Sequence, residues 1–221
     1  MRWLMLALVA CSEISAAPLV QREPTLEVSP VGELCVTKGA IDRHAITQPT
    51  VRAVGTGGGD AAQLAFTFRG NSADARALAN GSLRRQLGLK LRAQDSCNVV
   101  YVMWRLDPKP KLDVSVKHNP GKRSHAECGA DGYVKVRATH KPGALPSLVE
   151  GAGHTLRAEI VDGELFAWID GALVWQGRLP EQAAQISGPA GLRTDNLALD
   201  ALELSAPTGK GVCKRGAVAE D

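Results

Sequence analysis

The sequence predicts an all-β protein in which two antiparallel sheets pack face to face. Three observations support this fold class: short segments place apolar residues at every second position, turn-forming residues separate them, and no helical pattern of about 10 to 15 residues lies between them, as an α/β fold needs. The chain has 221 residues, of which 44% are hydrophobic, which is enough for one domain with a substantial core. The sequence therefore favours a sandwich.

Six segments show the alternation of strands that bury one face. They are residues 63–69, 87–93, 112–117, 133–138, 155–161 and 199–204. Residues 98–106 (NVVYVMWRL) are apolar on both faces, which predicts a strand in the middle of a sheet with Trp104 in the core. Turn chemistry connects the segments at residues 57–59, 119–121, 129–132, 162–163 and 170–171. Only residues 72–79 (SADARALA) predict a helix, of one or two turns, with Ser72 as its N-cap.

Residues 164–177 predict a β-hairpin around Asp170-Gly171, because Asp and Gly tolerate the positive φ of a type I′ turn. In the resulting register, one face carries Phe166, Trp168, Leu173 and Trp175, and the other carries Leu165, Ala167, Ile169, Ala172 and Val174. Exposed aromatic rings stack on the apolar faces of sugars, so Phe166, Trp168 and Trp175 are the candidate ligand-binding residues. The alternative is that another segment covers these rings, because tryptophan is usually mostly buried.

The first ten residues predict an export signal, in which Arg2 precedes an apolar run from Trp3 to Ala10 that is too short to span a bilayer as a helix. The run ends in Leu8-Val9-Ala10-Cys11, which resembles the bacterial lipobox and implies that Cys11 is the lipidated first residue of the mature protein. Ser12 after the cysteine is typical of delivery to the outer membrane of Gram-negative bacteria. Ordinary cleavage near residues 15–17 is the alternative, and both interpretations place the protein outside the cytoplasm.

The composition of the chain predicts how it is divided into tether, domain and tail. Residues 11–30 hold three prolines and no sustained period, which predicts a lipidated tether. We expect the sandwich over residues 31–213 and a flexible tail over residues 214–221.

Four cysteines remain after Cys11, and an even number in an exported chain predicts two disulfides. Of the three possible pairings we expect Cys97 with Cys128, which joins neighbouring segments, and Cys35 with Cys213, which ties the ends of the domain together. A structural zinc site near residues 125–128 (HAEC) is the alternative, although closely spaced ligand pairs such as CxxC are absent from the sequence.

Residues 64–206 resemble the concanavalin A-like group of jelly-roll sandwiches, which includes laminin G-like domains. The residues that carry the resemblance are 154–159 (HTLRAE), 165–171 with the Asp-Gly turn, Val174-Trp175, 188–196 (GPAGLRTDN) and 200–204 (DALEL). The resemblance implies an antiparallel jelly roll of the lectin and glucanase type. It also implies binding of carbohydrate or of a protein surface more often than catalysis, sometimes with calcium at the rim of a sheet.

Candidate calcium ligands are the oxygen-bearing residues at turns, namely Asp95, Asp170, Asp195 and Asn196. The alternative is that Asp and Asn occupy these positions because they favour turns. Beyond this possible calcium, no cofactor is expected. The net charge of +3 comes from interspersed charges without a basic block, which gives nucleic-acid binding little support.

The sequence assigns no catalytic residue, because a retaining glycosidase of this fold needs two nearby carboxylates on one strand, and the run E-x-D-x-x-E is absent. We therefore expect a surface-anchored, non-catalytic binding module for glycan. The alternatives are a related sugar-processing hydrolase and an adhesive lipoprotein that binds a cell-surface protein.

Overall fold

The computed structural model describes residues 26–30, 33–78, 80–140 and 145–209, and it confirms the predicted sandwich of two antiparallel sheets. Sheet A has the order β1 (Leu26–Pro30), β14 (Leu197–Pro207), β5 (Ala61–Asn71), β10 (Gly153–Val161), β11 (Glu164–Ile169) and β12 (Ala172–Arg178), and β3 (Ala45–Ile46) also pairs with β14. Sheet B has the order β2 (Cys35–Lys38), β4 (Thr50–Val54), β13 (Gly191–Asp195), β6 (Gln86–Leu91), β7 (Val99–Arg105), β8 (Lys111–Lys117) and β9 (Tyr133–Val136).

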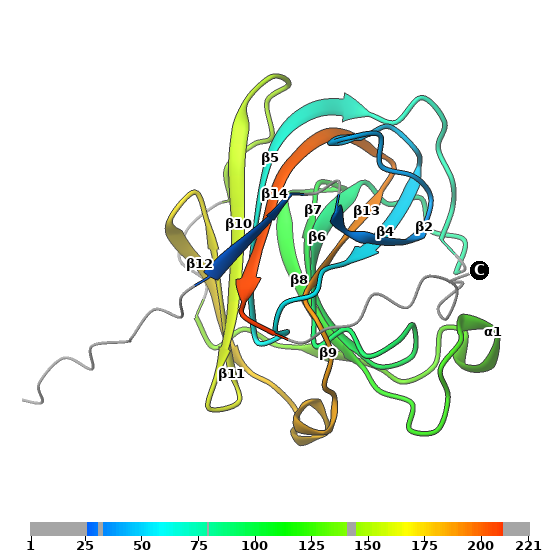
Figure 1. The fold of residues 1–221 in the computed structure, drawn as a ribbon, viewed down its shortest axis with the longest axis vertical. Coiled ribbons are helices and arrows are strands. Elements are labelled where there is room, and N and C mark those ends of the chain that lie inside the picture. The colour runs from blue at the N-terminus through cyan, green and yellow to red at the C-terminus, as the bar shows by residue number, and fades with distance from the viewer. Residues whose placement is uncertain (1–25, 31–32, 79, 141–144, 210–221) are drawn as a thin grey trace, which may run out of the picture.

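Strands from distant parts of the chain lie side by side, as in a jelly roll. In sheet A, β14 pairs with β5, and in sheet B, β13 pairs with β4 and β6. Figure 1 shows β10, β11 and β12 on the left side of the molecule and β2 and β4 on the right. Two short helices, α1 (His125–Cys128) and the 3-10 helix η2 (Glu181–Gln185), lie between strands. Within the described ranges, no helix is long and apolar enough to cross a membrane.

The hydrophobic core lies between the two sheets. Phe66 of β5 and Trp104 of β7 meet across it with ring centroids 6.3 Å apart and their planes nearly perpendicular. Trp104 is fully buried, as predicted. Apolar residues at alternate positions of each strand complete the core, among them Leu64, Leu87, Leu89, Val102, Val114, Leu156, Ala158, Leu165 and Leu192. The alternation read from the sequence therefore identifies which strand faces point inward.

The hairpin turns at Asp170-Gly171 as predicted, with φ of 50° and 80° at the two residues. Trp168 pairs with Leu173, but a β-bulge follows, so that Ala167 pairs with Trp175 instead of Val174. The extra residue turns the side chain of Trp175 into the core, where it is 2% exposed. The predicted face is therefore wrong for Trp175, because a bulge shifts every later residue to the opposite face.

Two further expectations are corrected. Residues 72–78 form no helix, because the side chain of Asn196 binds both the N–H and the C=O of Arg76, which a helix would use for its own hydrogen bonds. Residues 26–30, expected in the tether, form β1 and pair with residues 203–207 of β14. Without β1, the backbone N–H and C=O groups along this edge of β14 would have no strand to pair with, which is why the segment joins the sheet. Residues 1–25, with the predicted signal and Cys11, and residues 210–221 lie outside the described residues.

Candidate functional site

The outer face of sheet B, which points away from the core, is hollowed into a groove of about 650 Å³, which we name the sheet B groove. Its floor consists of alternate residues of β4, β13, β6, β7, β8 and β9. Residues 76–78, 80 and 84 form one wall, and residues 125, 129 and 130 close one end. The groove exists because a strand in a two-layer sandwich presents every second side chain to the outside.

Basic side chains dominate the lining of the sheet B groove. Eight of the lining residues are lysine or arginine and one is acidic, Asp113; the basic residues are Lys38, Arg52, Arg76, Arg84, Arg105, Lys117, Lys135 and Arg193. These residues are far apart in the sequence and form no basic block there. Strand alternation and pairing bring them to one face, which is why the interspersed charges of the sequence did not predict this surface.

A buried carboxylate organises the floor. Asp195 of β13 is fully buried and accepts hydrogen bonds from Arg52 Nη2 at 2.6 Å, Gln86 Nε2 at 2.6 Å and Arg193 Nε at 2.9 Å. Burial alone raises the pKa of a carboxyl group, but the charges of Arg193 and Arg52 outweigh it and hold the pKa of Asp195 below its ordinary value. Asp195 is therefore ionised and fixes two arginines beneath the groove.

Two tyrosines lie on the floor beside these arginines. The rings of Tyr101 and Tyr133 stack with centroids 6.2 Å apart. Arg193 lies over the Tyr101 ring at 5.0 Å, and Lys117 lies over the Tyr133 ring at 5.1 Å. Each ring thus contacts a cation as well as the other ring, which limits the ring face left for a ligand.

A second group of charges lies on the neighbouring strands β7, β8 and β9. Arg105 Nη1 donates to Asp113 Oδ2 at 2.6 Å, and Lys111 and Lys135 lie 3.2 Å and 3.4 Å from the same carboxylate. Burial tends to raise the pKa of Asp113, but hydrogen bonds from Arg105 and Lys111 bring it below the ordinary value. Both groove carboxylates are therefore ionised and paired.

Three buried polar atoms of this region have no hydrogen-bond partner among the described residues: Arg84 Nε, Gln86 Oε1 and Arg105 Nε. Gln86 and Arg105 are register partners on β6 and β7, and Arg84 lies two residues before Gln86. The side chains of all three residues line the groove, so an amide and two guanidinium groups lie close together there.

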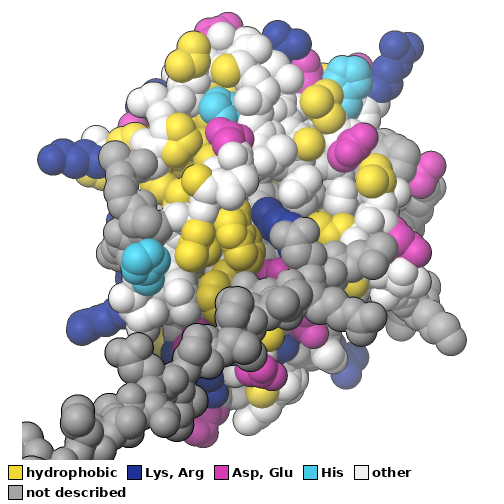
Figure 2. Space-filling model, turned by 90° about the vertical axis from the view of Figure 1, so that its left-hand side faces the viewer, with side chains coloured by type: hydrophobic (Ala, Val, Ile, Leu, Met, Phe, Trp, Pro, Cys, Tyr) yellow, Lys and Arg dark blue, Asp and Glu magenta, His cyan; other side chains and the backbone are white. Residues whose placement is uncertain are grey.

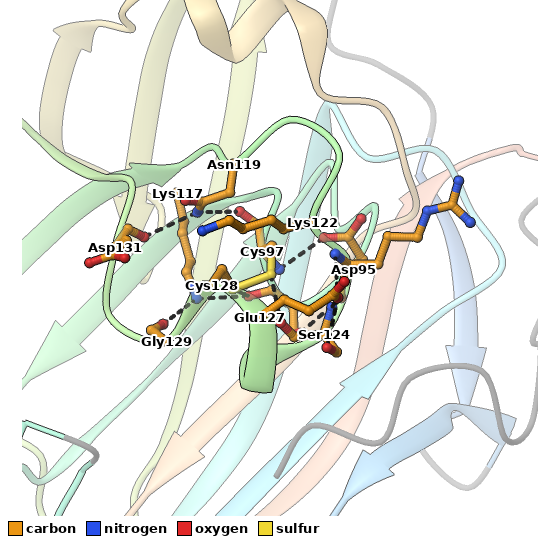
Figure 3. Close-up of a disulfide and its surroundings, with 12 residues drawn as sticks. Asp95, Cys97, Lys117, Asn119, Lys122, Ser124, Glu127, Cys128, Gly129 and Asp131 are labelled. Carbon is orange, nitrogen blue, oxygen red and sulfur yellow. Dashed lines mark hydrogen bonds between the residues drawn. A yellow bond between two sulfur atoms is a disulfide. The ribbon is translucent and has the colours of Figure 1, made fainter.

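The Cys97–Cys128 disulfide confirms a pairing predicted from the sequence. It joins the segment before β7 to α1 (Figure 3), and its Cα atoms are 5.9 Å apart. Lys117 is buried beside it and donates to the carbonyls of Ser96 at 3.1 Å and Gly129 at 2.8 Å. Ser96 and Gly129 line the groove, so these bonds fix its end.

The second predicted disulfide is only half described. Cys35 is disulfide-bonded, and Cys213 lies outside the described residues, so the Cys35–Cys213 pairing stays a prediction. The zinc alternative near residues 125–128 gains no support: among the described residues, no group of three His, Cys, Asp or Glu side chains is placed to hold a metal.

Phe166 and Trp168 of the predicted aromatic site lie on the outer face of sheet A, because Leu165 and Ala167 beside them point into the core. Figure 2 shows the left-hand side of the molecule in Figure 1, where β10, β11 and β12 lie. Hydrophobic side chains gather in the middle of this face. Phe166 and Trp168 are half-buried there with ring centroids 6.1 Å apart, and Arg157 lies 5.2 Å over the Trp168 ring. Trp175 is buried in the core and cannot join them. Ligand binding by Phe166 and Trp168 stays a prediction.

The structure gives the candidate calcium ligands other roles. Asp195 is paired with arginines, and Asn196 binds the backbone carbonyls of Arg76 and Arg84 at 2.9 Å and 2.8 Å.

The other two candidates also bind parts of the protein. Asp170 accepts from the N–H of Thr155 at 2.7 Å and lies 2.8 Å from His154 Nδ1. Asp95 accepts from the N–H of Cys97 at 2.8 Å. The turn preference of Asp and Asn accounts for Asp170 and Asn196, which have positive φ, whereas Asp195 ends strand β13. Asn196 positions the wall of the groove.

Comparisons with known proteins give structural neighbours only. No protein-family model matches the chain, and no curated protein matches its sequence. Among solved structures, a carbohydrate-binding module, CBM66, from Bacillus subtilis is 11% identical, with 81% of this chain and 96% of that chain covered and a TM-score of 0.48. The Crh5 transglycosylase in complex with NAG is 13% identical, with 83% of both chains covered and a TM-score of 0.42. Sheep galectin-11 in complex with glycerol is 8% identical, with 82% and 96% covered and a TM-score of 0.37.

Proposed function

We propose that this protein is a non-catalytic carbohydrate-binding module whose ligand lies in the sheet B groove. The groove volume of about 650 Å³ falls in the usual range of ligand sites. Its lining offers hydroxyl, amide, ammonium and guanidinium groups together with two tyrosines. Sugar hydroxyls both donate and accept hydrogen bonds, so a lining of mixed donors and acceptors suits them.

The observation that carries the proposal is the composition of the groove lining around β6 and β7. Gln86 and Arg105 are register partners there, Arg84 lies two residues before Gln86, and all three line the groove. The hydroxyl residues Thr50, Ser96 and Ser115 belong to the same lining. Amide and hydroxyl groups both donate and accept hydrogen bonds and guanidinium groups donate several, which suits a ligand that carries many hydroxyls.

The groove carboxylates support binding rather than hydrolysis. A glycosidase acid must hold a proton, so its pKa has to be raised by its environment. The pKa values of Asp113 and Asp195 are both lowered by neighbouring cations, and Asp195 is fully buried. Within the described residues these two are the carboxylates in and beneath the groove, and neither is suited to donate a proton.

A groove-filling substitution tests the location. We expect Ser115→Trp, which adds a ring on β8 inside the groove, to abolish binding of the purified full chain to a polysaccharide panel in affinity electrophoresis. Trp168→Ala removes a ring of the aromatic site predicted on the opposite sheet, so it tests that alternative, and with the ligand in the groove it should bind as the unchanged protein does. Circular dichroism and thermal melting check that both variants fold.

The opposite pattern, with binding lost in Trp168→Ala and kept in Ser115→Trp, would place the ligand on sheet A and refute the groove. Release of reducing ends from a bound polysaccharide would refute the non-catalytic role in favour of the hydrolase alternative.

We also propose that the chain is exported and anchored to a bacterial membrane, with the outer membrane as its destination. The sequence Leu8-Val9-Ala10-Cys11 after an apolar run supports this. Expression in a Gram-negative host with an alkyne fatty acid should label the wild-type protein, and Cys11→Ser should remove the label. A labelled Cys11→Ser protein, or an unlabelled wild type, would contradict lipid attachment at this cysteine.

A further inference from the structure

We infer that the ligand of the sheet B groove is an acidic polysaccharide, whose sugar rings carry carboxylate or sulfate groups. The inference rests on the proposed function and names the ligand class of the same site. Eight lysine and arginine side chains line the groove against one aspartate, whereas the whole chain carries a formal charge of only +3. The groove lining therefore carries a larger positive charge than the chain as a whole, which favours a negatively charged ligand.

The basic side chains of the groove differ in how they are neutralised. On the floor, Arg52 and Arg193 share Asp195, and Arg105 binds Asp113. On the wall, Arg76 and Arg84 make no ion pair with any described carboxylate, and the buried Nε of Arg84 has no hydrogen-bond partner among the described residues. The wall arginines therefore have unused capacity to bind an anion.

The backbone around the wall arginines is fixed in place. Asn196 accepts from the N–H of Arg76 at 2.7 Å and donates to the carbonyls of Arg76 and Arg84. Burial, with the like charge of Arg105 beside it, lowers the pKa of Arg84. An anion bound between the guanidinium groups of Arg84 and Arg105 would reduce the repulsion between them. A planar guanidinium can bind a carboxylate or sulfate through two parallel N–H donors.

The aromatic residues of the groove separate an acidic glycan from the other polyanion class, single-stranded nucleic acid. Proteins that bind single strands stack successive bases on exposed ring faces. The rings of Tyr101 and Tyr133 instead stack on each other and contact Arg193 and Lys117. Tyr101 is 4% exposed and Tyr133 is 44% exposed, so only the ring of Tyr133 is accessible, and one ring does not give the row of platforms on which successive bases stack. The groove recognises charge and hydroxyl groups rather than flat bases.

Matched polymers test this inference on the full chain by affinity electrophoresis and calorimetry. Polygalacturonate is compared with its carboxyl-reduced form, which has the same backbone without charge, and dextran sulfate is compared with dextran. Oligo-dT at the same salt concentration is the nucleic-acid arm. We expect binding to one or both acidic glycans at least roughly tenfold tighter than to their neutral partners, and weaker as NaCl rises from about 50 to 500 mM.

Three variants that each remove one positive charge test whether the wall of the groove binds the acidic glycan. Arg84→Gln and Arg76→Gln each remove one positive charge from the wall, and each should weaken acidic-glycan binding roughly tenfold. Arg178→Gln removes one charge from the exposed end of β12 on sheet A and should leave binding unchanged. The use of two wall variants keeps the test valid if one of them folds poorly.

The outcomes separate this inference from the proposed function. Equal binding of the charged and neutral partners, or preference for a neutral glycan, overturns the acidic ligand and leaves glycan binding intact. Binding of oligo-dT as tight as that of the acidic glycans overturns glycan selectivity. Binding of no glycan at all overturns both proposals. An equal loss in Arg178→Gln and Arg84→Gln would refute the assignment to the wall.

Discussion

Replacing Asp195 with asparagine tests the charge network beneath the sheet B groove. The side chain of Asp195 is fully buried and neutralises Arg52 and Arg193, whose side chains are 8% and 13% exposed. Asparagine keeps the shape but removes the negative charge, which leaves two buried guanidinium groups side by side. Breaking a buried ion pair on one side costs about 3 to 5 kcal/mol, so we expect a loss of that size in the free energy of unfolding at pH 7.

Urea denaturation followed by tryptophan fluorescence measures this loss, which corresponds to a fall in Tm of roughly 6 to 20 °C for a domain of this size. Asp200→Asn is the matched control, because Asp200 pairs at 2.7 Å with Arg69, whose side chain is 53% exposed. The control should lose less than about 1 kcal/mol, since solvent screens exposed pairs.

The free energy of unfolding of the wild type and of Asp195→Asn, measured as a function of pH, gives a second test. The pKa of Asp195 is lowered in the folded state relative to the ordinary value of 3.8. Its contribution to stability is therefore complete above pH 3.8 and decreases as the pH falls toward the folded pKa. The gap between wild type and Asp195→Asn should stay constant from pH 8 to about 5 and narrow below pH 3.8. A gap under about 1 kcal/mol at pH 7, or one that widens in acid, would refute the reasoning.

The remaining predictions concern the disulfide and the hairpin tryptophans. The double change Cys97→Ser with Cys128→Ser should lower the free energy of unfolding by about 3 to 4 kcal/mol, because the bond closes a loop with a sequence separation of 31. Calorimetry checks this, and an unchanged Tm would contradict it. Trp175→Ala should cost about 3 to 5 kcal/mol, because the ring is 2% exposed in the core. Trp168→Ala should cost clearly less in the same urea titration, because its ring is half-buried, and equal losses would contradict the bulged register.

The sequence predicts the fold better than it predicts the site. Local alternation defines the inward face of each strand, so the buried positions of β5, β8 and β10 can be derived from the sequence alone. The hairpin turn and the Cys97–Cys128 bond are also local features, and both were predicted. The bulge beside Trp168 was not, because the hairpin register read from the turn does not reveal an extra residue.

The sheet B groove could not be predicted in the same way, because its residues come together only through pairing between distant strands. Arg52 and Asp195 are 143 residues apart in the chain and 2.6 Å apart in space. One signal was present: residues 98–106 are apolar on both faces, and the face away from the core carries Tyr101 and Met103, which line the groove. We interpreted this pattern only as central burial, although a ligand-binding floor produces it too.

In strand β7, the groove floor and the hydrophobic core are built from the same short segment of chain. Val102 and Trp104 pack inside the sandwich, while their immediate neighbours Tyr101 and Met103 line the groove. Adjacent residues of one strand therefore face different environments, and a substitution at Tyr101 or Met103 reshapes the groove floor while the side chains that hold the two sheets together stay in place.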